Sequence, residues 1–155
     1  MLALVAAAVL SQPPLFLEEI DAALVDTRAV YPVPRALVRA VIRQESRGNP
    51  KALSPVGAIG LMQVMPINAM KLGLKSEKEL WVPRLNILAG VRLLAALLRH
   101  YEGDIISALV AYNSGPKRPT KVPENGETPE YVVNILGFYR RFLSEESPDA
   151  GVVVR

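Results

Sequence analysis

The sequence of 155 residues contains no cysteine and a single histidine, His100. Without cysteine there is no disulfide framework, no iron–sulfur cluster, no thiolate zinc site and no cysteine nucleophile. One imidazole cannot build a zinc site of several histidines, and a Ser-His-Asp triad would have to include His100, which we interpret as structural. We therefore expect no metal and no other cofactor, and any acid–base chemistry falls to carboxylates.

The sequence also lacks a long run of basic residues. Its 18 Lys and Arg against 15 Asp and Glu give a formal net charge of +3. The cations are dispersed, with the densest group at Lys117, Arg118 and Lys121. Because dispersed positive charges are typical of a solvated face, we do not expect nucleic acid to be a partner.

The apolar run at the start of the sequence is too short to span a membrane. Met1–Leu10 contains ten residues, whereas a spanning helix needs about 20. Ala6 and Ala8 are spaced like the small residues of a secretory cleavage site, but no Lys or Arg precedes the run. Two interpretations of residues 1–14 stay open: an export signal, or a short helix that packs on the domain.

The composition is that of one globular domain, because half of the residues are hydrophobic and 21% are charged. No segment shows sustained alternation of apolar and polar residues, so we expect an all-α fold with little or no sheet. We place the domain at residues 15–145 and a loose tail at residues 146–155. About seven helices are expected, at residues 15–30, 34–46, 58–72 (broken or kinked at Pro66), 76 onward in a short helix, 85–101, 104–112 and 128–143.

Glu45 is the strongest candidate for acid–base chemistry. It follows Val38, Val41 and Ile42 by seven, four and three residues, and this spacing places its carboxyl on the apolar face of the helix. Its position near the helix C-terminus also disfavours negative charge. Both effects are expected to raise the pKa of Glu45, as in a general acid that works near neutral pH.

Four blocks carry a family resemblance. They are Glu45-Ser46-Arg47-Gly48-Asn49-Pro50, Ser54-Pro55-Val56-Gly57-Ala58-Ile59-Gly60-Leu61-Met62-Gln63-Val64-Met65-Pro66, Ala111-Tyr112-Asn113-Ser114-Gly115-Pro116 and Glu127-Thr128-Pro129-Glu130-Tyr131-Val132. In this order they resemble the soluble lytic transglycosylase family, over about residues 31–139. The resemblance implies a lysozyme-like helical domain with a cleft, the fold that this family shares with goose-type lysozymes.

The resemblance also implies an activity. It predicts cleavage of the bond between N-acetylmuramic acid and N-acetylglucosamine in peptidoglycan, with a 1,6-anhydro ring on the muramic acid. Glu45 matches the single catalytic acid/base of the family. The residues agree with a single acid, because no Asp or Glu occurs between Ser46 and Ser76, and assistance by the substrate N-acetyl group needs only one protein carboxyl.

The remaining family positions imply further roles. Ser54 matches a loop hydroxyl near the reacting sugars, Gln63 and Met65 match residues that line the cleft, and Tyr112 matches an aromatic residue near Glu45. Asn113 matches a residue that caps the same helix end, and Glu127 and Tyr131 match the far wall of the cleft. For Leu61, Met62 and Met65, packing in the core is an equal alternative. For Glu127 we favour a structural role over a second functional acid. Gly57, Gly60 and Gly90 are expected to meet backbone or packing needs.

Two competing functions stay open. A goose-lysozyme-like hydrolase would cleave the same bond with water, and a non-catalytic domain would only bind the glycan. We expect a monomer in the periplasm or exported to the cell wall, with peptidoglycan strands as its partner. The small size suggests service to a secretion, conjugation, pilus or phage apparatus, which is an analogy with similar proteins.

Overall fold

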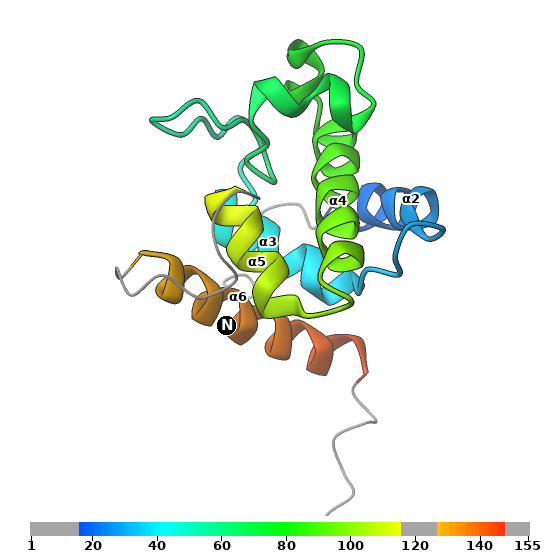
Figure 1. The fold of residues 1–155 in the computed structure, drawn as a ribbon, viewed down its shortest axis with the longest axis vertical. Coiled ribbons are helices and arrows are strands. Elements are labelled where there is room, and N and C mark those ends of the chain that lie inside the picture. The colour runs from blue at the N-terminus through cyan, green and yellow to red at the C-terminus, as the bar shows by residue number, and fades with distance from the viewer. Residues whose placement is uncertain (1–15, 116–126, 148–155) are drawn as a thin grey trace, which may run out of the picture.

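The computed structural model describes residues 16–115 and 127–147, and this part of the chain is α-helical without a β-strand (Figure 1). The expected all-α class is confirmed. The α-helices are α2 (Leu17–Thr27), α3 (Arg35–Ser46), α4 (Pro83–His100), α5 (Ile105–Ser114) and α6 (Glu127–Glu146), and the short 3-10 helices are η1 (Pro66–Asn68), η2 (Met70–Leu72) and η3 (Glu77–Trp81).

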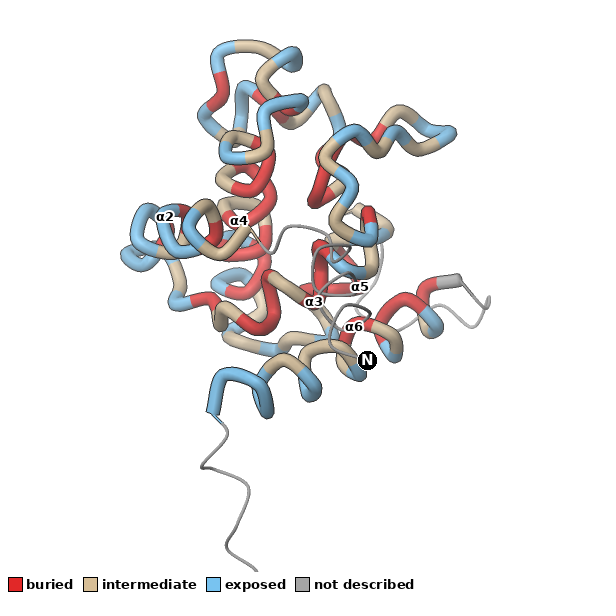
Figure 2. The backbone as a smooth tube through the Cα atoms, turned by 180° about the vertical axis from the view of Figure 1, so that it is seen from behind, coloured by how far each residue is buried: buried red, intermediate tan, exposed pale blue. Residues whose placement is uncertain are grey.

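Helix α4 is the central element of the fold. In Figure 1 it runs along the long axis, with α2 and α5 packed against it and α6 across one end of the molecule, where α6 packs against α3. The three 3-10 helices gather around the start of α4 at the opposite end. Buried residues concentrate on the faces that these helices turn to one another (Figure 2). One hydrophobic core therefore extends from the 3-10 helices at one end of the molecule to helices α3 and α6 at the other end.

Proline positions explain where α3 and α4 begin. Pro34 precedes α3 with extended backbone, and Pro83 occupies the first turn of α4. Proline is well placed there because its missing N–H group would have no partner within the helix. One face of α3 is then fully buried, and it includes Leu37, Val38 and Val41. This is the face on which the spacing of the sequence placed Glu45.

The prediction of a helix at residues 58–72 is wrong. The segment instead forms isolated antiparallel bridges between Leu53 and Ile59 and between Ile59 and Val64, followed by η1 and η2. Gly60 and Gln63 have φ angles of 76° and 48°, in the left-handed region, which a right-handed helix cannot contain. The apolar residues from Ala58 to Val64 are buried in a folded loop, whereas Met65, Ile67 and Met70 are exposed. A short apolar run in a sequence does not distinguish such a loop from a buried helix.

Residues 76–79 have the sequence form of a capping box (Ser-Glu-Lys-Glu) at the start of the expected short helix, but the structure does not form one. The Ser76 side chain makes no capping hydrogen bond, and the element that follows is the 3-10 helix η3. The Glu79 carboxylate does reach back, but it accepts from the backbone N–H of Lys75 over 2.8 Å. The pattern therefore predicted the start of a helical turn correctly, but it did not predict the hydrogen bonds that cap this turn.

Some expectations fall outside the described residues. These are the two interpretations of residues 1–14, the basic group at Lys117, Arg118 and Lys121, and most of the tail, although α6 itself extends to Glu146.

None of the helices in residues 16–115 and 127–147 combines the length and apolarity needed to cross a bilayer. The same residues contain no group of three or more acidic, histidine or cysteine side chains that could hold a metal ion.

Candidate active site

Glu45 lies in the last turn of α3, and its side chain is half-buried. Burial raises the pKa of Glu45 from 4.5 to about 7, against a smaller lowering effect of a hydrogen bond from Tyr131. The upward direction expected from the sequence is confirmed, with loss of solvation as its main cause. Arg43 and Arg47, two residues to either side, are exposed and leave the carboxyl without a cation partner on its own helix.

Ser46 fixes the backbone beside Glu45. Its buried hydroxyl lies 2.8 Å from the carbonyl oxygen of Leu61 and 3.1 Å from that of Ile42, and it accepts from the N–H of Gly48. The contact with Leu61 joins the end of α3 to the loop that follows. Ser46 therefore holds local structure, as expected for a polar residue at a helix end.

Tyr131 approaches Glu45 from α6. Its hydroxyl donates to Glu45 Oε1 over 2.6 Å. We expected Tyr131 on the far wall of a cleft, whereas the structure places it in direct contact with the candidate acid. Burial and the nearby charge of Glu45 raise the pKa of Tyr131 well above its usual value, so the phenol keeps its proton and remains a donor.

Tyr112 approaches from α5. Its hydroxyl donates to the backbone carbonyl of Met62 over 2.8 Å and not to Glu45. It is nevertheless close enough that the charge of Glu45, after burial, raises the pKa of Tyr112 well above its usual value. The structure thus places Tyr112 near Glu45, but the hydroxyl that contacts the Glu45 carboxyl is that of Tyr131.

Gln63 and Ser54 hold the loop at residues 52–64 in shape. The Gln63 side-chain amide donates to the carbonyls of Gly60 and Ala52 over 2.9 and 3.3 Å. The Ser54 hydroxyl accepts from the N–H of Ala58 over 2.9 Å. Because both amide hydrogens of Gln63 are occupied, only its Oε1 atom is left to meet a ligand, as an acceptor. Contact of either residue with sugar stays a prediction.

Asn86 connects the same loop to α4, a role that the sequence analysis missed. This buried side chain accepts from the N–H of Met62 over 2.9 Å and donates to the carbonyls of Ile59 and Leu80, each over 2.8 Å. It satisfies three backbone groups at once. The signal in the sequence is an amide inside an apolar helix, because a buried polar side chain requires partners.

Gly60 and Gly90 allow this close packing, as expected. Gly60 has a φ of 76°, and a Cβ atom there would lie 2.4 Å from Nδ2 of Asn86. A Cβ atom at Gly90 would lie 2.4 Å from the sulfur of Met62. Both positions therefore exclude side chains, and Gly60 also needs a backbone conformation that other residues rarely adopt. Gly57 has a φ of 89°, with open space around it.

The three apolar candidates of the loop divide into two classes. Leu61 and Met62 are fully buried, which confirms the alternative of core packing for them. Met65 is 36% exposed, so its side chain is accessible to a ligand. Only Met65 therefore stays a candidate for lining a binding surface.

Asn113 is placed differently from the expectation, whereas the expectation for Glu127 stays open. Asn113 lies within α5, and its Oδ1 atom accepts from the hydroxyl of Thr128 in α6 over 3.3 Å. The residue that caps α5 is Gly115, whose N–H donates to the carbonyl of Ala111. Glu127 begins α6, and its side chain lies outside what the structure describes. Asn113 thus joins α5 to α6, and the role of Glu127 stays a prediction.

These contacts bring α3, α5, α6 and the 52–64 loop together around one carboxyl. Among the side chains that the structure describes, no other carboxylate contributes to the pKa of Glu45. The arrangement offers a proton near neutral pH and a phenol that stabilises the carboxylate left after the proton departs. It can therefore act as a general acid and then as a general base.

Sequence comparisons identify relatives of this chain. The family model described as "Transglycosylase SLT domain" matches residues 26–132. The transglycosylase of Enterobacteria phage PRD1 is 44% identical over 87 residues, which are 56% of this chain and 31% of the phage protein. The soluble lytic murein transglycosylase of Escherichia coli K12 is 34% identical over 140 residues, covering 74% of this chain and 22% of the relative. The chain therefore spans less than a third of the length of these relatives.

Solved structures of similar fold agree. The 70 kDa soluble lytic transglycosylase of Escherichia coli superposes with a TM-score of 0.68 at 30% identity, covering 79% of this chain and 24% of that protein. An inactive glutamate-to-glutamine mutant of the lytic transglycosylase Slt from Pseudomonas aeruginosa gives the same TM-score and identity, covering 80% and 24%. With a family model that matches well over half of its length, this chain belongs to the SLT transglycosylase family.

Proposed function

We propose that this chain is a peptidoglycan lytic transglycosylase that cleaves the β-1,4 bond between N-acetylmuramic acid and N-acetylglucosamine. Membership of the SLT family supports the substrate class. The observation that carries the proposal is the burial of Glu45, which raises its pKa to about 7. At neutral pH a substantial fraction of this carboxyl retains the proton that bond cleavage requires.

The proposed reaction uses Glu45 twice. In the first step neutral Glu45 protonates the glycosidic oxygen as the bond to the anomeric carbon breaks, and the substrate N-acetyl group assists at that carbon. In the second step the Glu45 carboxylate takes the proton of the C6 hydroxyl of the muramic acid, and that oxygen bonds to the anomeric carbon. The product carries a 1,6-anhydro ring, and Glu45 regains its proton. No second protein carboxylate takes part.

Tyr131 suits both steps. While Glu45 is neutral, the phenol donates to Oε1, which leaves Oε2 as the oxygen that carries the transferable proton. Once the proton has moved, the same hydrogen bond becomes charge-assisted and stabilises the carboxylate. Tyr131 thus favours the charged form at the moment when it arises. Gln63, Ser54, Met65 and Glu127 are proposed to bind substrate or support the cleft around this pair.

The inactive mutant of the Pseudomonas relative carries glutamine in place of a glutamate. A protein of this family is thus inactivated by loss of one carboxyl, in agreement with a single acid/base. In this chain we assign that role to Glu45.

The phage relatives suggest a biological setting. Besides the PRD1 protein, the peptidoglycan transglycosylase gp16 of phage T7 is 37% identical over 86 residues of this chain. We propose that this chain opens the cell wall locally for a phage, secretion, conjugation or pilus assembly and works in the periplasm or at the wall.

The test is the Glu45→Gln variant, assayed on purified murein sacculi with mass analysis of the products. We expect the wild-type products to contain ends lighter by one water than a reducing sugar, because the anhydro ring forms without hydrolysis. The variant is expected to lose about 100-fold or more in rate while it remains folded and binds glycan. Reducing ends would instead indicate a hydrolase of goose-lysozyme type.

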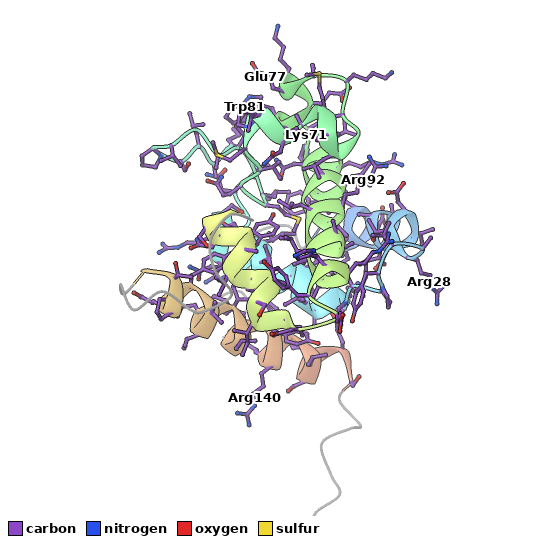
Figure 3. All side chains as sticks on the ribbon, in the orientation of Figure 1. Arg28, Lys71, Glu77, Trp81, Arg92 and Arg140 are labelled. Atoms are coloured by element: carbon purple, nitrogen blue, oxygen red, sulfur yellow. The ribbon has the colours of Figure 1, made fainter. Side chains whose placement is uncertain are left out.

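The matched control is Glu77→Gln. Glu77 is exposed on η3 and lies at the far end of the molecule from α6 (Figure 3). The same chemical change there should leave the rate unchanged. Full turnover of Glu45→Gln would remove Glu45 from its role, and absence of cleavage by the wild-type protein would favour a glycan-binding domain.

A further inference from the structure

Helices α3 and α6 pack in antiparallel order, with two regularly spaced cation–aromatic contacts between them. The guanidinium carbon of Arg39 lies 4.1 Å from the ring centroid of Phe142, and that of Arg43 lies 5.9 Å from the ring centroid of Phe138. The two arginines are four residues apart on α3, and the two phenylalanines are four apart on α6. Because four residues make about one helical turn, the two contacts lie about one turn apart on both helices.

Arg39 also binds the end of α6 through two ion pairs. Its Nη2 atom lies 2.8 Å from Oε2 of Glu145, and its Nη1 atom lies 3.1 Å from Oε1 of Glu146. The Arg39 side chain is 11% exposed, whereas Arg92, in the ion pair between α4 and α2, is 30% exposed. Arg39 is therefore largely shielded from solvent, whereas its partners Glu145 and Glu146 are 44% and 25% exposed. One guanidinium thus joins two carboxylates and the Phe142 ring of α6 to α3.

Nearer the C-terminus of α3 and the N-terminus of α6, the hydrogen bond between Tyr131 and Glu45 joins the same two helices. It follows the Arg39–Phe142 and Arg43–Phe138 contacts in the same antiparallel order, towards the C-terminus of α3 and the N-terminus of α6. A slip of α6 by one turn would move it by about 5.4 Å, which the 2.6 Å hydrogen bond cannot follow. The alignment of the two helices therefore determines whether Tyr131 reaches Glu45.

We propose that Arg39 is a positioning residue, which clamps the C-terminal end of α6 to α3 and so holds the Tyr131 hydroxyl on Glu45. The alignment of α3 and α6 by Arg39 does not depend on what the protein cleaves. Only the expected effect of Arg39 on turnover rests on the proposed function. The hydrogen bond from Arg39 also lowers the pKa of Glu145, as expected for a carboxylate beside a cation.

The clamp has a measurable consequence for the titration of Glu45. Among the side chains that the structure describes, the titratable groups that face Glu45 are those of Tyr131 from α6 and Tyr112 from α5, while Arg43 and Arg47 on α3 are exposed. Of these, Tyr131 is the one that stabilises the charged carboxylate by a hydrogen bond. If the hydroxyl withdraws, the pKa of Glu45 rises, and the protein keeps its acid form to higher pH.

The experiment is a double-mutant cycle with Arg39→Gln, Tyr131→Phe and the double variant, read by NMR titration of the Glu45 side-chain carboxyl in the full chain. Glu45→Gln assigns the resonance. Tyr131→Phe should raise the midpoint by about one pH unit, the scale of one hydrogen bond to a charged group. Arg39→Gln should raise it by a smaller amount in the wild-type background and should cause no further rise with Phe at position 131.

Two controls separate positioning from other effects. A direct effect of the lost Arg39 charge would persist in the Tyr131→Phe background, whereas an effect through Tyr131 disappears there. Arg92→Gln removes an ion pair of the same 2.8 Å length between α4 and α2, where Figure 3 shows Arg92, and should leave the midpoint unchanged. Arg39→Lys keeps the charge but not the planar contact with Phe142, so it should raise the pKa of Glu45 by an intermediate amount. It replaces Arg39→Gln in the experiment if that variant does not fold.

Activity supplies the second readout. In the sacculus assay, Arg39→Gln should shift the alkaline limb of the rate profile in the direction that Tyr131→Phe shifts it. The proposal is overturned if folded Arg39→Gln, or Arg39→Lys in its place, titrates like the wild-type protein, or if the shifts of Arg39→Gln and Tyr131→Phe add. If the titration behaves as expected but the wild-type protein cleaves no glycan, the proposed function fails and the positioning role stands.

Discussion

Tyr131 donates a hydrogen bond to Glu45 across 86 positions of sequence, with 2.6 Å between the two oxygen atoms. Two opposing effects meet in this pair. Burial raises the pKa of Glu45, and the bond from Tyr131 lowers it, with a result of about 7. A carboxyl that titrates near neutral pH can both give and take a proton there, which a one-carboxylate mechanism requires.

The first prediction concerns the pH dependence of the reaction. Glu45 must be protonated to start the cycle, so the rate at limiting substrate should fall as pH rises through the pKa of about 7. An ordinary exposed glutamate would lose its proton near pH 4.5 and give no acid-dependent limb at neutral pH. Initial rates of muropeptide release from sacculi, measured from about pH 5 to about pH 9, check this. A flat profile across this range would contradict the assignment of Glu45 as the acid.

The second prediction concerns stability. The pKa of Glu45 is raised in the folded state, so the folded protein binds the proton more tightly than the unfolded chain does. The stability from neutral burial is complete below about pH 4.5 and is lost as pH rises through about 7. Glu45→Gln keeps the shape and stays neutral. It should therefore match the wild-type protein near pH 4 and exceed its free energy of unfolding by about 2–3 kcal/mol near pH 8.

Urea unfolding at the two pH values measures this difference. Glu77→Gln, the same substitution at an exposed site, should show no such dependence on pH. Equal stability of Glu45→Gln and wild-type protein at alkaline pH would mean that the carboxylate is well solvated. The expected gain in stability on loss of the acid is the trade-off typical of a catalytic group held in an unfavourable environment.

The third prediction separates the two tyrosines beside Glu45. Tyr131→Phe removes the bond to the carboxyl and should raise the pKa of Glu45, with a slower reaction because the carboxylate formed in the first step loses its donor. Tyr112→Phe instead leaves the carbonyl of Met62 without its donor, which should cost about 1–3 kcal/mol of stability. NMR titration of Glu45 and urea unfolding of both variants distinguish the roles. Identical effects of the two substitutions would contradict this division.

The sequence predicted the helices well where burial follows a helical period. The apolar positions of α3 placed Glu45 on the buried face, and the predicted helix from residue 34 matches α3, whereas α4 begins at Pro83, two residues before the predicted start. The segment at residues 58–72 failed for a physical reason. The apolar side chains of residues 58–64 are buried because the loop turns at the left-handed residues Gly60 and Gln63 and bonds to Asn86, and none of these features creates a periodic pattern.

The candidate site was only partly predictable for the same reason. Family motifs brought Glu45, Tyr112 and Tyr131 into consideration, but the choice between the two phenols depends on how α5 and α6 meet the end of α3. The Tyr131 hydroxyl reaches Glu45, and the Tyr112 hydroxyl meets a backbone carbonyl instead. Such a choice rests on the packing of helices distant in sequence, and no local pattern records it.

The fourth prediction concerns Asn86, which joins α4 to the loop at residues 52–64. Asn86→Ala leaves the N–H of Met62 and the carbonyl of Leu80 without their partners inside the protein, while the carbonyl of Ile59 keeps its bond from the N–H of Val64. Each unsatisfied buried group costs about 1–3 kcal/mol, so we expect a loss of about 2 kcal/mol or more. Asn49→Ala is the matched control, because the Asn49 side chain is exposed and should cost less than about 0.5 kcal/mol.

The Asn86 substitution should also affect turnover. The carbonyl of Met62 that Tyr112 binds and the carbonyl of Leu61 that Ser46 contacts belong to the loop that Asn86 holds. At a temperature where Asn86→Ala remains folded, its rate on sacculi should therefore fall, while the rate of Asn49→Ala should not. A destabilised but fully active Asn86→Ala protein would show that the loop keeps its shape at the acid without this amide, and that Asn86 serves stability alone.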